Sequence, residues 1–267
     1  MEVVKPVKRN VLLNPGPATT SDAVKYAQVI PDICPREQEF VDIMTRVRKD
    51  LVKVVHGDPE KYTSVIFTGS GTIVQDVLVN SLVPEGKKIL VVNNGAYAAR
   101  MVEIAQYYNI DCVDIQSSTT GLPDLAEVKK AIEEDKDIAV VAAVHHETGT
   151  GVLNPVKEIG RIAHDNDCIF IVDTISTYGL RPLDIEEENI DFLMSSAQKG
   201  LAAMTGASWT VGNIKAIEKS KTFPKRSYYC NLFMQYDFFN RVGEMHFTPP
   251  VQTIYALEQA LKEYFEE

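Results

Sequence analysis

The chain has 267 residues, of which 45% are hydrophobic and 24% charged, the composition of a globular protein rather than a disordered one. Its 27 basic and 37 acidic residues give a formal charge of -10 without any Lys- or Arg-rich block, which argues against a nucleic-acid partner. The longest apolar run, Ile138 to Val144, is too short to cross a bilayer, and Met1 to Asn10 lacks the apolar stretch of a signal peptide. We therefore expect a cytoplasmic protein without a membrane partner.

The first part of the chain, residues 1–39, differs in character from the rest. Asn14-Pro15-Gly16-Pro17 and two later prolines predict an extended, turn-rich segment with little periodicity. Residues 40–267 are expected to form one large domain, which begins with a long helix over 40–55.

Strand-like and helix-like stretches then alternate. Short apolar runs rich in β-branched residues predict buried, largely parallel strands at 63–68, 88–92, 138–144, 168–172, 192–195 and 208–211. Helical spacing occurs at 72–82, 96–108, 125–134 and 156–166, and a last helix at 251–265 follows Thr248-Pro249-Pro250. This order predicts a three-layer α/β/α domain with a mostly parallel sheet.

The first motif that could carry chemistry is Gly69-Ser70-Gly71-Thr72, between a strand and a helix. Free backbone N–H groups, the helix dipole and two hydroxyls would face one anion there, which makes the turn a candidate phosphate site. It fails the dinucleotide fingerprint because Val74 replaces the third glycine, and no Gly-Lys-Ser/Thr follows. A glycine-rich turn that binds nothing is an equally good interpretation of this motif alone.

Two charged residues are predicted to lie at the same edge of the sheet. Asp173 follows the buried run 168–172, and Lys199 follows the strand at 192–195. Considered alone, Asp173 is slightly better interpreted as a helix N-cap and Lys199 as an exposed loop lysine. Together with the phosphate turn they match the needs of pyridoxal phosphate (PLP): an anchored phosphate, a carboxylate for the ring nitrogen and an amine for the aldehyde.

Metal binding is not expected. His145-His146-Glu147 places two imidazoles side by side, but adjacent strand residues point to opposite faces and cannot readily share an ion. The cysteines are far apart and form no C-x-x-C pair, which suits reduced thiols at Cys34, Cys112, Cys168 and Cys230.

Six short stretches in this order resemble the class V aminotransferases, and within them most closely the 2-aminoethylphosphonate:pyruvate aminotransferases. The matching stretches are Gly69-Ser70-Gly71-Thr72, Asn94-Gly95-Ala96-Tyr97 with Arg100-Met101, His146-Glu147-Thr148 with Thr150-Gly151, Val172-Asp173 with Ser176, Ser195-Ser196-Ala197 with Lys199, and Thr248-Pro249-Pro250. The resemblance extends over nearly the whole chain. It implies a PLP-transferase large domain with Lys199 and Asp173 as catalytic residues.

The resemblance also implies roles for further residues. It assigns the cofactor phosphate to Ser70, Gly71, Thr72, Gln198 and Thr248, the ring faces to Tyr97 and Ile175, and the ring hydroxyl to Thr148. Thr248 would reach the cofactor from a neighbouring subunit, so a homodimer is expected. Core packing remains an alternative for Tyr97 and Ile175, and a helix cap for Thr248.

The implied reaction is transfer of an amino group from 2-aminoethylphosphonate to pyruvate, giving phosphonoacetaldehyde and alanine. An alanine:glyoxylate or serine:pyruvate type aminotransferase, a truncated PLP-binding protein with little turnover and, most weakly, a nucleotide-binding dehydrogenase are the alternatives. Arg36 is the best candidate for the substrate's phosphonate or carboxylate, although a surface salt bridge with a nearby Glu is also open. Family members continue beyond the last helix into a C-terminal small domain that supplies an arginine, and we expect that domain to be largely absent here.

Overall fold

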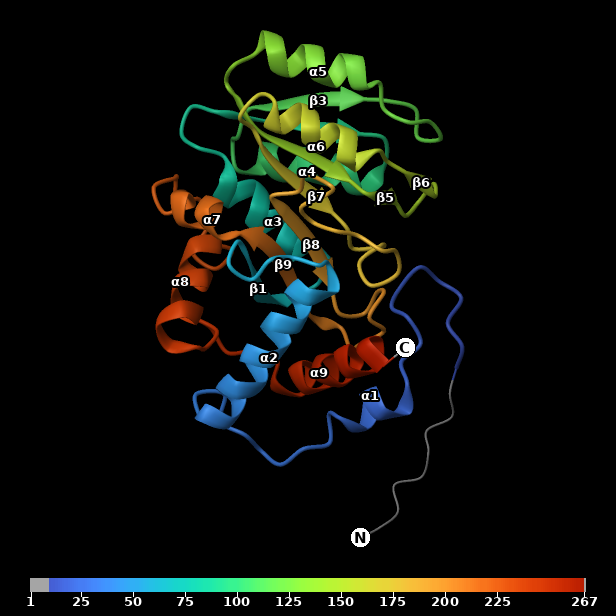
Figure 1. Ribbon diagram of the computed structural model, residues 1–267, viewed down its shortest axis with the longest axis vertical. Helices are drawn as coiled ribbons and strands as arrows, with labels where there is room; N and C mark the ends of the chain where they lie inside the picture. The colour runs from blue at the N-terminus through green and yellow to red at the C-terminus, as the bar shows by residue number, and fades with distance from the viewer. Residues whose placement is uncertain (1–9, 267) are drawn as a thin grey trace.

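The computed structural model describes residues 10–266, which form three layers: a central sheet between two layers of helices (Figure 1). The sheet has seven strands in the order β1-β9-β8-β7-β4-β2-β3. Only β9 runs antiparallel to its neighbours, so the prediction of a mostly parallel sheet is confirmed. The strands are β1 (Tyr62–Gly69), β2 (Lys88–Asn93), β3 (Cys112–Gln116), β4 (Ile138–Val144), β7 (Ile169–Asp173), β8 (Phe192–Ser196) and β9 (Gly206–Asn213).

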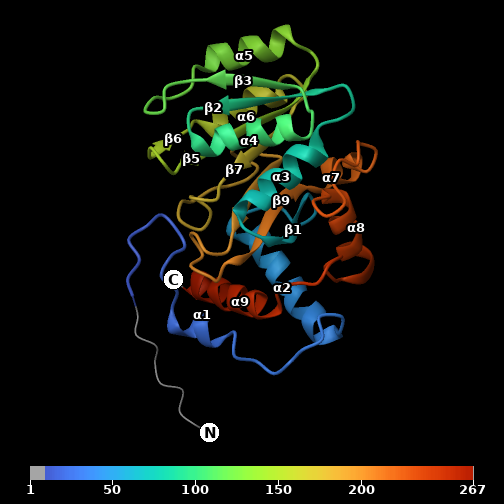
Figure 2. The same ribbon diagram turned by 180° about the vertical axis from the view of Figure 1, so that it is seen from behind.

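Helices cover both faces of this sheet. One layer contains α3 (Gly71–Leu82), α4 (Ala96–Tyr107), α7 (Ile214–Ser220) and α8 (Leu232–Val242), which lie in front in Figure 2. The other contains α1 (Asp22–Tyr26), α2 (Gln38–Val54), α5 (Leu125–Glu134), α6 (Val156–His164) and α9 (Val251–Glu266). No helix in residues 10–266 is long and apolar enough to cross a membrane.

The predicted elements agree with the structure wherever the chain is buried on both sides. The strand at 138–144 has the predicted bounds, because its apolar side chains are covered by α4 and α6. The edge strand β3 was not predicted, since its alternating, half-exposed residues lack a continuous apolar run. The short hairpin of β5 (His146–Glu147) and β6 (Val152–Leu153) was also missed.

The prediction also missed three helices, α1, α7 and α8. Helix α1 lies within the segment predicted to be extended, and its cap is Ser21, whose side chain accepts from the Val24 N–H. Helix α8 has a complete pair of boundary signals, with Asn231 accepting from Met234 at its start and Gly243 in the left-handed region after its end. Those signals flank the aromatic-rich sequence of α8, whose periodicity is too irregular to predict a helix by itself.

Candidate active site

Neighbouring parallel strands bring the two predicted catalytic residues to one edge of the sheet. Asp173 is the last residue of β7, and its register partner on β8 is Met194. Lys199 follows β8 in the next turn, while α3 starts directly after β1, whose direction matches that of β7 and β8. The carboxyl ends of these strands therefore meet where open α/β sheets bind ligands.

Asp173 is only 3% exposed and both of its carboxylate oxygens accept a hydrogen bond. Oδ1 accepts the Ile175 N–H at 2.9 Å, and Oδ2 accepts Nε2 of Gln75 at 2.7 Å. Burial raises the pKa of Asp173 to about 6, although both hydrogen bonds oppose the rise. A turn follows Asp173 rather than a helix, so the interpretation as a helix N-cap is wrong.

The partner of Asp173, Gln75, was not among the predicted site residues. It lies in the second turn of α3 and its side chain is fully buried. Its Nε2 also donates to the Tyr97 carbonyl at 3.2 Å, at the start of α4. A polar side chain between the buried Val74 and Val77 of α3 was the signal that could have identified it.

A second buried carboxylate, that of Glu147, lies on the other side of Tyr97. Glu147 is fully buried on β5, and the Tyr97 N–H approaches its oxygens at 3.3 and 3.4 Å. A Cβ added to Gly95 would overlap the Glu147 side chain, so a glycine is needed where α4 begins. The first turn of α4 is thereby fixed between Glu147 and Gln75.

The N-terminal segment lies across Lys199. The lysine Nζ donates to the Pro15 carbonyl at 3.4 Å, and the Ala18 N–H donates to the Gln198 carbonyl at 2.8 Å. A Cβ at Gly16 would lie 2.9 Å from the Lys199 Nζ. The turn-rich stretch of residues 14–17 therefore packs directly on the predicted catalytic amine.

The predicted phosphate turn has the features of a polar socket. Ser70 precedes α3 and its side chain makes no cap hydrogen bond. A Cβ at Gly71 would lie 2.7 Å from Ile175 Cδ1 and 3.3 Å from Ser196 Oγ, so the turn approaches both closely. Within residues 10–266, the buried Ser196 Oγ, Thr68 Oγ1 and Gln198 Oε1 have no hydrogen-bond partner.

Aromatic and cationic groups flank this turn. The Arg100 guanidinium lies 5.0 Å from the centroid of the Tyr97 ring, and its Nη1 approaches Thr72 Oγ1 at 3.4 Å. Thr148 is half-buried in the turn after β5. The sequence predicted no role for Arg100, although a cation between a tyrosine and a phosphate turn is placed to bind an anion.

Two predicted site residues lie apart from this group within the chain. Thr248 is exposed in the connection from α8 to α9. Arg36 forms an ion pair with Glu244 at 2.7 Å and donates to the Met245 and His246 carbonyls at 2.6 and 3.4 Å. Arg36 thus contacts the α8–α9 connection, which also contains Thr248.

The adjacent histidines take separate hydroxyl partners. His145 Nδ1 lies 2.9 Å from Thr177 Oγ1, and His146 Nδ1 lies 3.0 Å from Ser176 Oγ. Burial lowers the pKa of His145 to about 4, so its ring is neutral at pH 7. No group of three or more His, Cys, Asp or Glu side chains in the described part of the chain could hold a metal ion.

The chain resembles known proteins both in sequence and in fold. Residues 22–267 match the family described as Aminotransferase class-V. The chain is 36% identical over 258 residues to a bifunctional phosphonoacetaldehyde hydrolase/aminoethylphosphonate transaminase of Clostridioides difficile, covering 96% of this chain and 40% of that one. It is 35% identical to a 2-aminoethylphosphonate–pyruvate transaminase of Lysinibacillus sphaericus, covering 96% and 69%. The crystal structure of an alanine–glyoxylate aminotransferase from Nostoc sp. superposes with a TM-score of 0.88 at 26% identity, covering 98% and 70%.

Proposed function

This chain belongs to the class-V aminotransferase family, and from that premise we propose that it transfers the amino group of 2-aminoethylphosphonate to pyruvate with PLP as cofactor. The observation that carries the proposal is the meeting of Lys199, the buried Asp173 carboxylate and the start of α3 at one sheet edge. The choice of amino donor is supported by the names of the bacterial relatives at 35–36% identity. The chain spans 40% of the bifunctional relative and 69% of the other.

The residues at this edge fit PLP. Its phosphate needs hydrogen-bond donors. Beside the α3 N-terminus lie the Ser70 hydroxyl, which makes no cap hydrogen bond, and the Ser196 hydroxyl, which has no partner within residues 10–266. The turn is narrow enough that a Cβ at Gly71 would occupy part of it. Tyr97 and Ile175 would then cover the two ring faces, with Thr148 near the ring hydroxyl and Gln198 at the phosphate.

The chemistry divides between cofactor and protein. PLP, when bound, supplies an electron sink for the bonds at the substrate's amino carbon. Asp173, ionised above its pKa of about 6, would keep a proton on the pyridine nitrogen. Lys199 would hold the cofactor through its amine and, once released, move a proton at Nζ as general base and acid. The segment at Pro15, which already contacts Nζ, would exclude water from the amine.

Substrate recognition and dimerisation form a linked part of the proposal. Arg36 donates to the carbonyls of Met245 and His246, just before Thr248, so the two residues share one surface. If Thr248 reaches a neighbouring subunit's phosphate turn, Arg36 is carried toward that subunit's substrate. Its guanidinium would exchange Glu244 for a phosphonate.

A second candidate is an alanine:glyoxylate type aminotransferase. It is favoured by the TM-score of 0.88 to the enzyme from Nostoc sp., a structure of which this chain covers 70%. The two candidates share the cofactor site and differ in the amino donor and in the keto-acid acceptor.

Titration with PLP followed by amino donors tests the proposal. We expect the protein to develop the visible absorbance of PLP condensed with a lysine, and 2-aminoethylphosphonate to discharge it faster than L-alanine or L-serine does. Pyruvate should then restore the absorbance and release L-alanine. Discharge by L-alanine or L-serine alone would replace the proposed donor, and PLP uptake without any discharge would show a binding protein rather than a transaminase.

A further inference from the structure

The side chain of Gln75 occupies a position that core packing alone does not explain. It is fully buried on α3, and burying an amide is unfavourable unless its hydrogen bonds are made. Its two Nε2 hydrogens are both used, toward Asp173 Oδ2 at 2.7 Å and the Tyr97 carbonyl at 3.2 Å. Its Oε1 has no partner within residues 10–266.

This pattern fixes the orientation of the amide. Both groups beside Nε2 are acceptors, a carboxylate and a carbonyl, so the flipped amide would set oxygen against oxygen twice. Leaving Oε1 unpaired is unfavourable, and the two bonds from Nε2 to Asp173 Oδ2 and the Tyr97 carbonyl offset that cost. An apolar side chain of the same length would fill the space and make neither bond.

The two acceptors belong to the two residues that would meet the cofactor ring. Asp173 would face the ring nitrogen, and Tyr97 would cover one ring face. Ile175 holds the other carboxylate oxygen, and Glu147 holds the Tyr97 N–H, so Gln75 is the bridge between two otherwise separate supports. We propose that Gln75 is a positioning residue that keeps the Asp173 carboxylate ionised and aimed at the cofactor while it fixes Tyr97 at the start of α4. This inference rests on the proposed function.

The charges around Asp173 explain why an amide is needed. Burial raises the pKa of Asp173, the neighbouring Glu147 raises it further, and the bonds from Ile175 and Gln75 and the charge of Arg100 lower it. The backbone N–H of His145 donates to the backbone carbonyl of Asp173 at 2.8 Å, and the His145 ring is neutral at pH 7. A neutral donor at position 75 stabilises the ionised form without adding a third carboxylate or a competing cation.

Two substitutions test the role. Gln75→Met keeps the length of the side chain and removes the amide donor. The titration midpoint of the Asp173 carboxyl should therefore rise by about one pH unit, roughly a tenfold gain in proton affinity. Gln75→Glu keeps the shape and adds a carboxyl, so the midpoint should rise further as the two acids share a proton. If Gln75→Met fails to fold, the nearly isosteric Gln75→Glu carries the test.

The matched control is Asn80→Leu on the same helix. Asn80 is a buried amide whose Nδ2 donates to the Asp76 and Cys230 carbonyls at 2.7 and 2.8 Å, away from Asp173. Its loss should lower the thermal midpoint as Gln75→Met does, without moving the Asp173 titration. An equal titration shift in Asn80→Leu would overturn the proposal, because general loosening would then explain the effect.

The measurement is made on apoprotein and holoprotein. In the apoprotein, carbon NMR follows the Asp173 carboxyl, assigned by its disappearance in Asp173→Asn. In the holoprotein, the acid limb of kcat should move to higher pH and kcat should fall while the KM for the amino donor stays within about twofold. Unchanged midpoints in both Gln75 variants would refute the role of Gln75, whereas a wild-type protein that takes up no PLP would refute the proposed function and leave the apoprotein result standing.

Discussion

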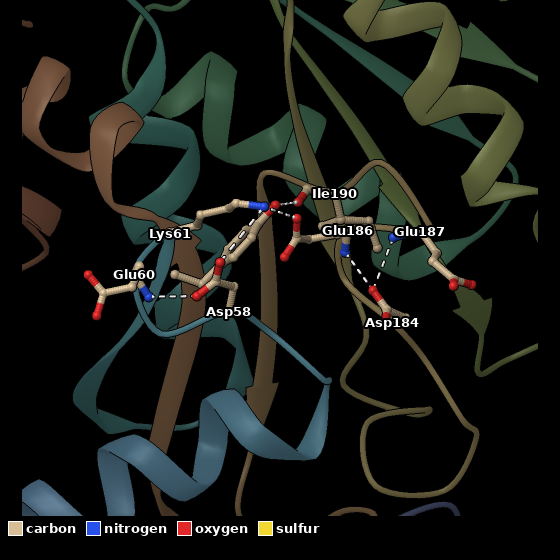
Figure 3. A network of polar contacts seen from close by, with 8 residues as sticks. Asp58, Glu60, Lys61, Asp184, Glu186, Glu187 and Ile190 are labelled. Atoms are coloured by element: carbon tan, nitrogen blue, oxygen red, sulfur yellow. Dashed lines mark hydrogen bonds and ion pairs between the residues drawn. The ribbon is translucent and has the colours of Figure 1, made fainter.

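The two ends of the central sheet each bear a cluster of lysine and acidic side chains. The clusters differ in how far they are buried and in whether their polar groups find partners within the chain. The amino-edge cluster consists of Asp58, Lys61, Asp184 and Glu186, close to the starts of β1 and β8 (Figure 3). The carboxyl-edge cluster consists of Gln75, Asp173, Glu147, Tyr97 and Lys199, at the ends of β7 and β8 and the starts of α3 and α4.

At the amino edge the charges neutralise one another in solvent. Lys61 lies 2.5 Å from Glu186 and 3.8 Å from Asp58, and Asp184 accepts the Glu186 N–H. The Lys61 side chain is 54% exposed, so this pair is a solvated structural contact (Figure 3). A cavity of about 810 Å³ lies nearby at the amino end of β1, lined by Arg48, Lys53, Tyr62 and Asn240 among others.

At the carboxyl edge the acids are buried and the donors and acceptors do not balance. Asp173 is 3% exposed with a raised pKa, while hydroxyl and amide atoms beside α3 have no partner in the described chain. A lysine and an acid in one region are therefore weak evidence of function. The candidate site is distinguished by buried polar groups that lack hydrogen-bond partners in the described chain. Substitutions at the two edges should therefore have different effects.

The largest difference is expected between the two lysines. Lys199→Ala should abolish the visible absorbance formed with PLP and lower turnover at least about 10³-fold, because both the covalent anchor and the proton carrier are lost. Lys61→Ala removes a lysine from the amino edge and should leave both readouts unchanged. Absorbance spectra and steady-state rates measure this, and an intact spectrum in Lys199→Ala would remove the cofactor assignment.

The next difference concerns how stability changes with pH at two acids, Asp173 at the carboxyl edge and Asp135 at the amino edge. The folded-state pKa of Asp173 is about 6 rather than 3.8. Between these two pH values the folded protein binds more protons than the unfolded chain, so its stability falls as pH rises. Asp173→Asn removes this loss, so the free energy of unfolding of the variant minus that of the wild type should grow by about 2–3 kcal/mol between pH 4 and pH 8. Urea unfolding of the apoproteins measures it.

An acid at the amino edge supplies the control of opposite sign. The hydrogen bond from Lys88 lowers the pKa of Asp135, so that bond stabilises the fold above the ordinary pKa and is lost as pH falls. The variant-minus-wild-type difference for Asp135→Asn should therefore decrease as pH rises. A flat difference for Asp173→Asn would show that Asp173 titrates as it does in the unfolded chain, and the electrostatic contrast between the edges would disappear.

A smaller effect is expected at Gly16, which packs on Lys199. A Cβ there would overlap Lys199 Cδ and lie 2.9 Å from Nζ, so Gly16→Ala should displace the amine and lower kcat by up to about 10²-fold. Gly86→Ala is the control, because Gly86 also has positive φ but has open space around its Cβ position. Both variants should lose about 1–2 kcal/mol from backbone strain, and only Gly16→Ala should lose rate. Equal rates would show that the segment at residues 14–17 does not position the lysine.

The sequence predicted the parts of this contrast that depend on local order. Asp173 and Lys199 follow buried strands, and parallel strands bring such residues to one edge whatever the details of packing. The bridge through Gln75 depends on side chains from α3, β7 and α4 meeting in space, which no local pattern encodes. The contact of Pro15 with Lys199 joins residues far apart in the chain, and the pairing of Arg36 with Glu244 likewise depends on how α8 ends.

The smallest effect is predicted for the ion pair of the amino edge. Lys61→Ala, Glu186→Ala and the double variant form a cycle, and each should shift the thermal midpoint by no more than about 2 °C at low salt. The bond from Glu186 raises the pKa of Lys61, but both side chains are exposed, so screening at 1 M salt should remove the coupling. Thermal unfolding at two salt concentrations measures it. A coupling that survives high salt would mean that the amino edge excludes solvent as the carboxyl edge does, and burial would no longer separate the candidate site from the structural cluster.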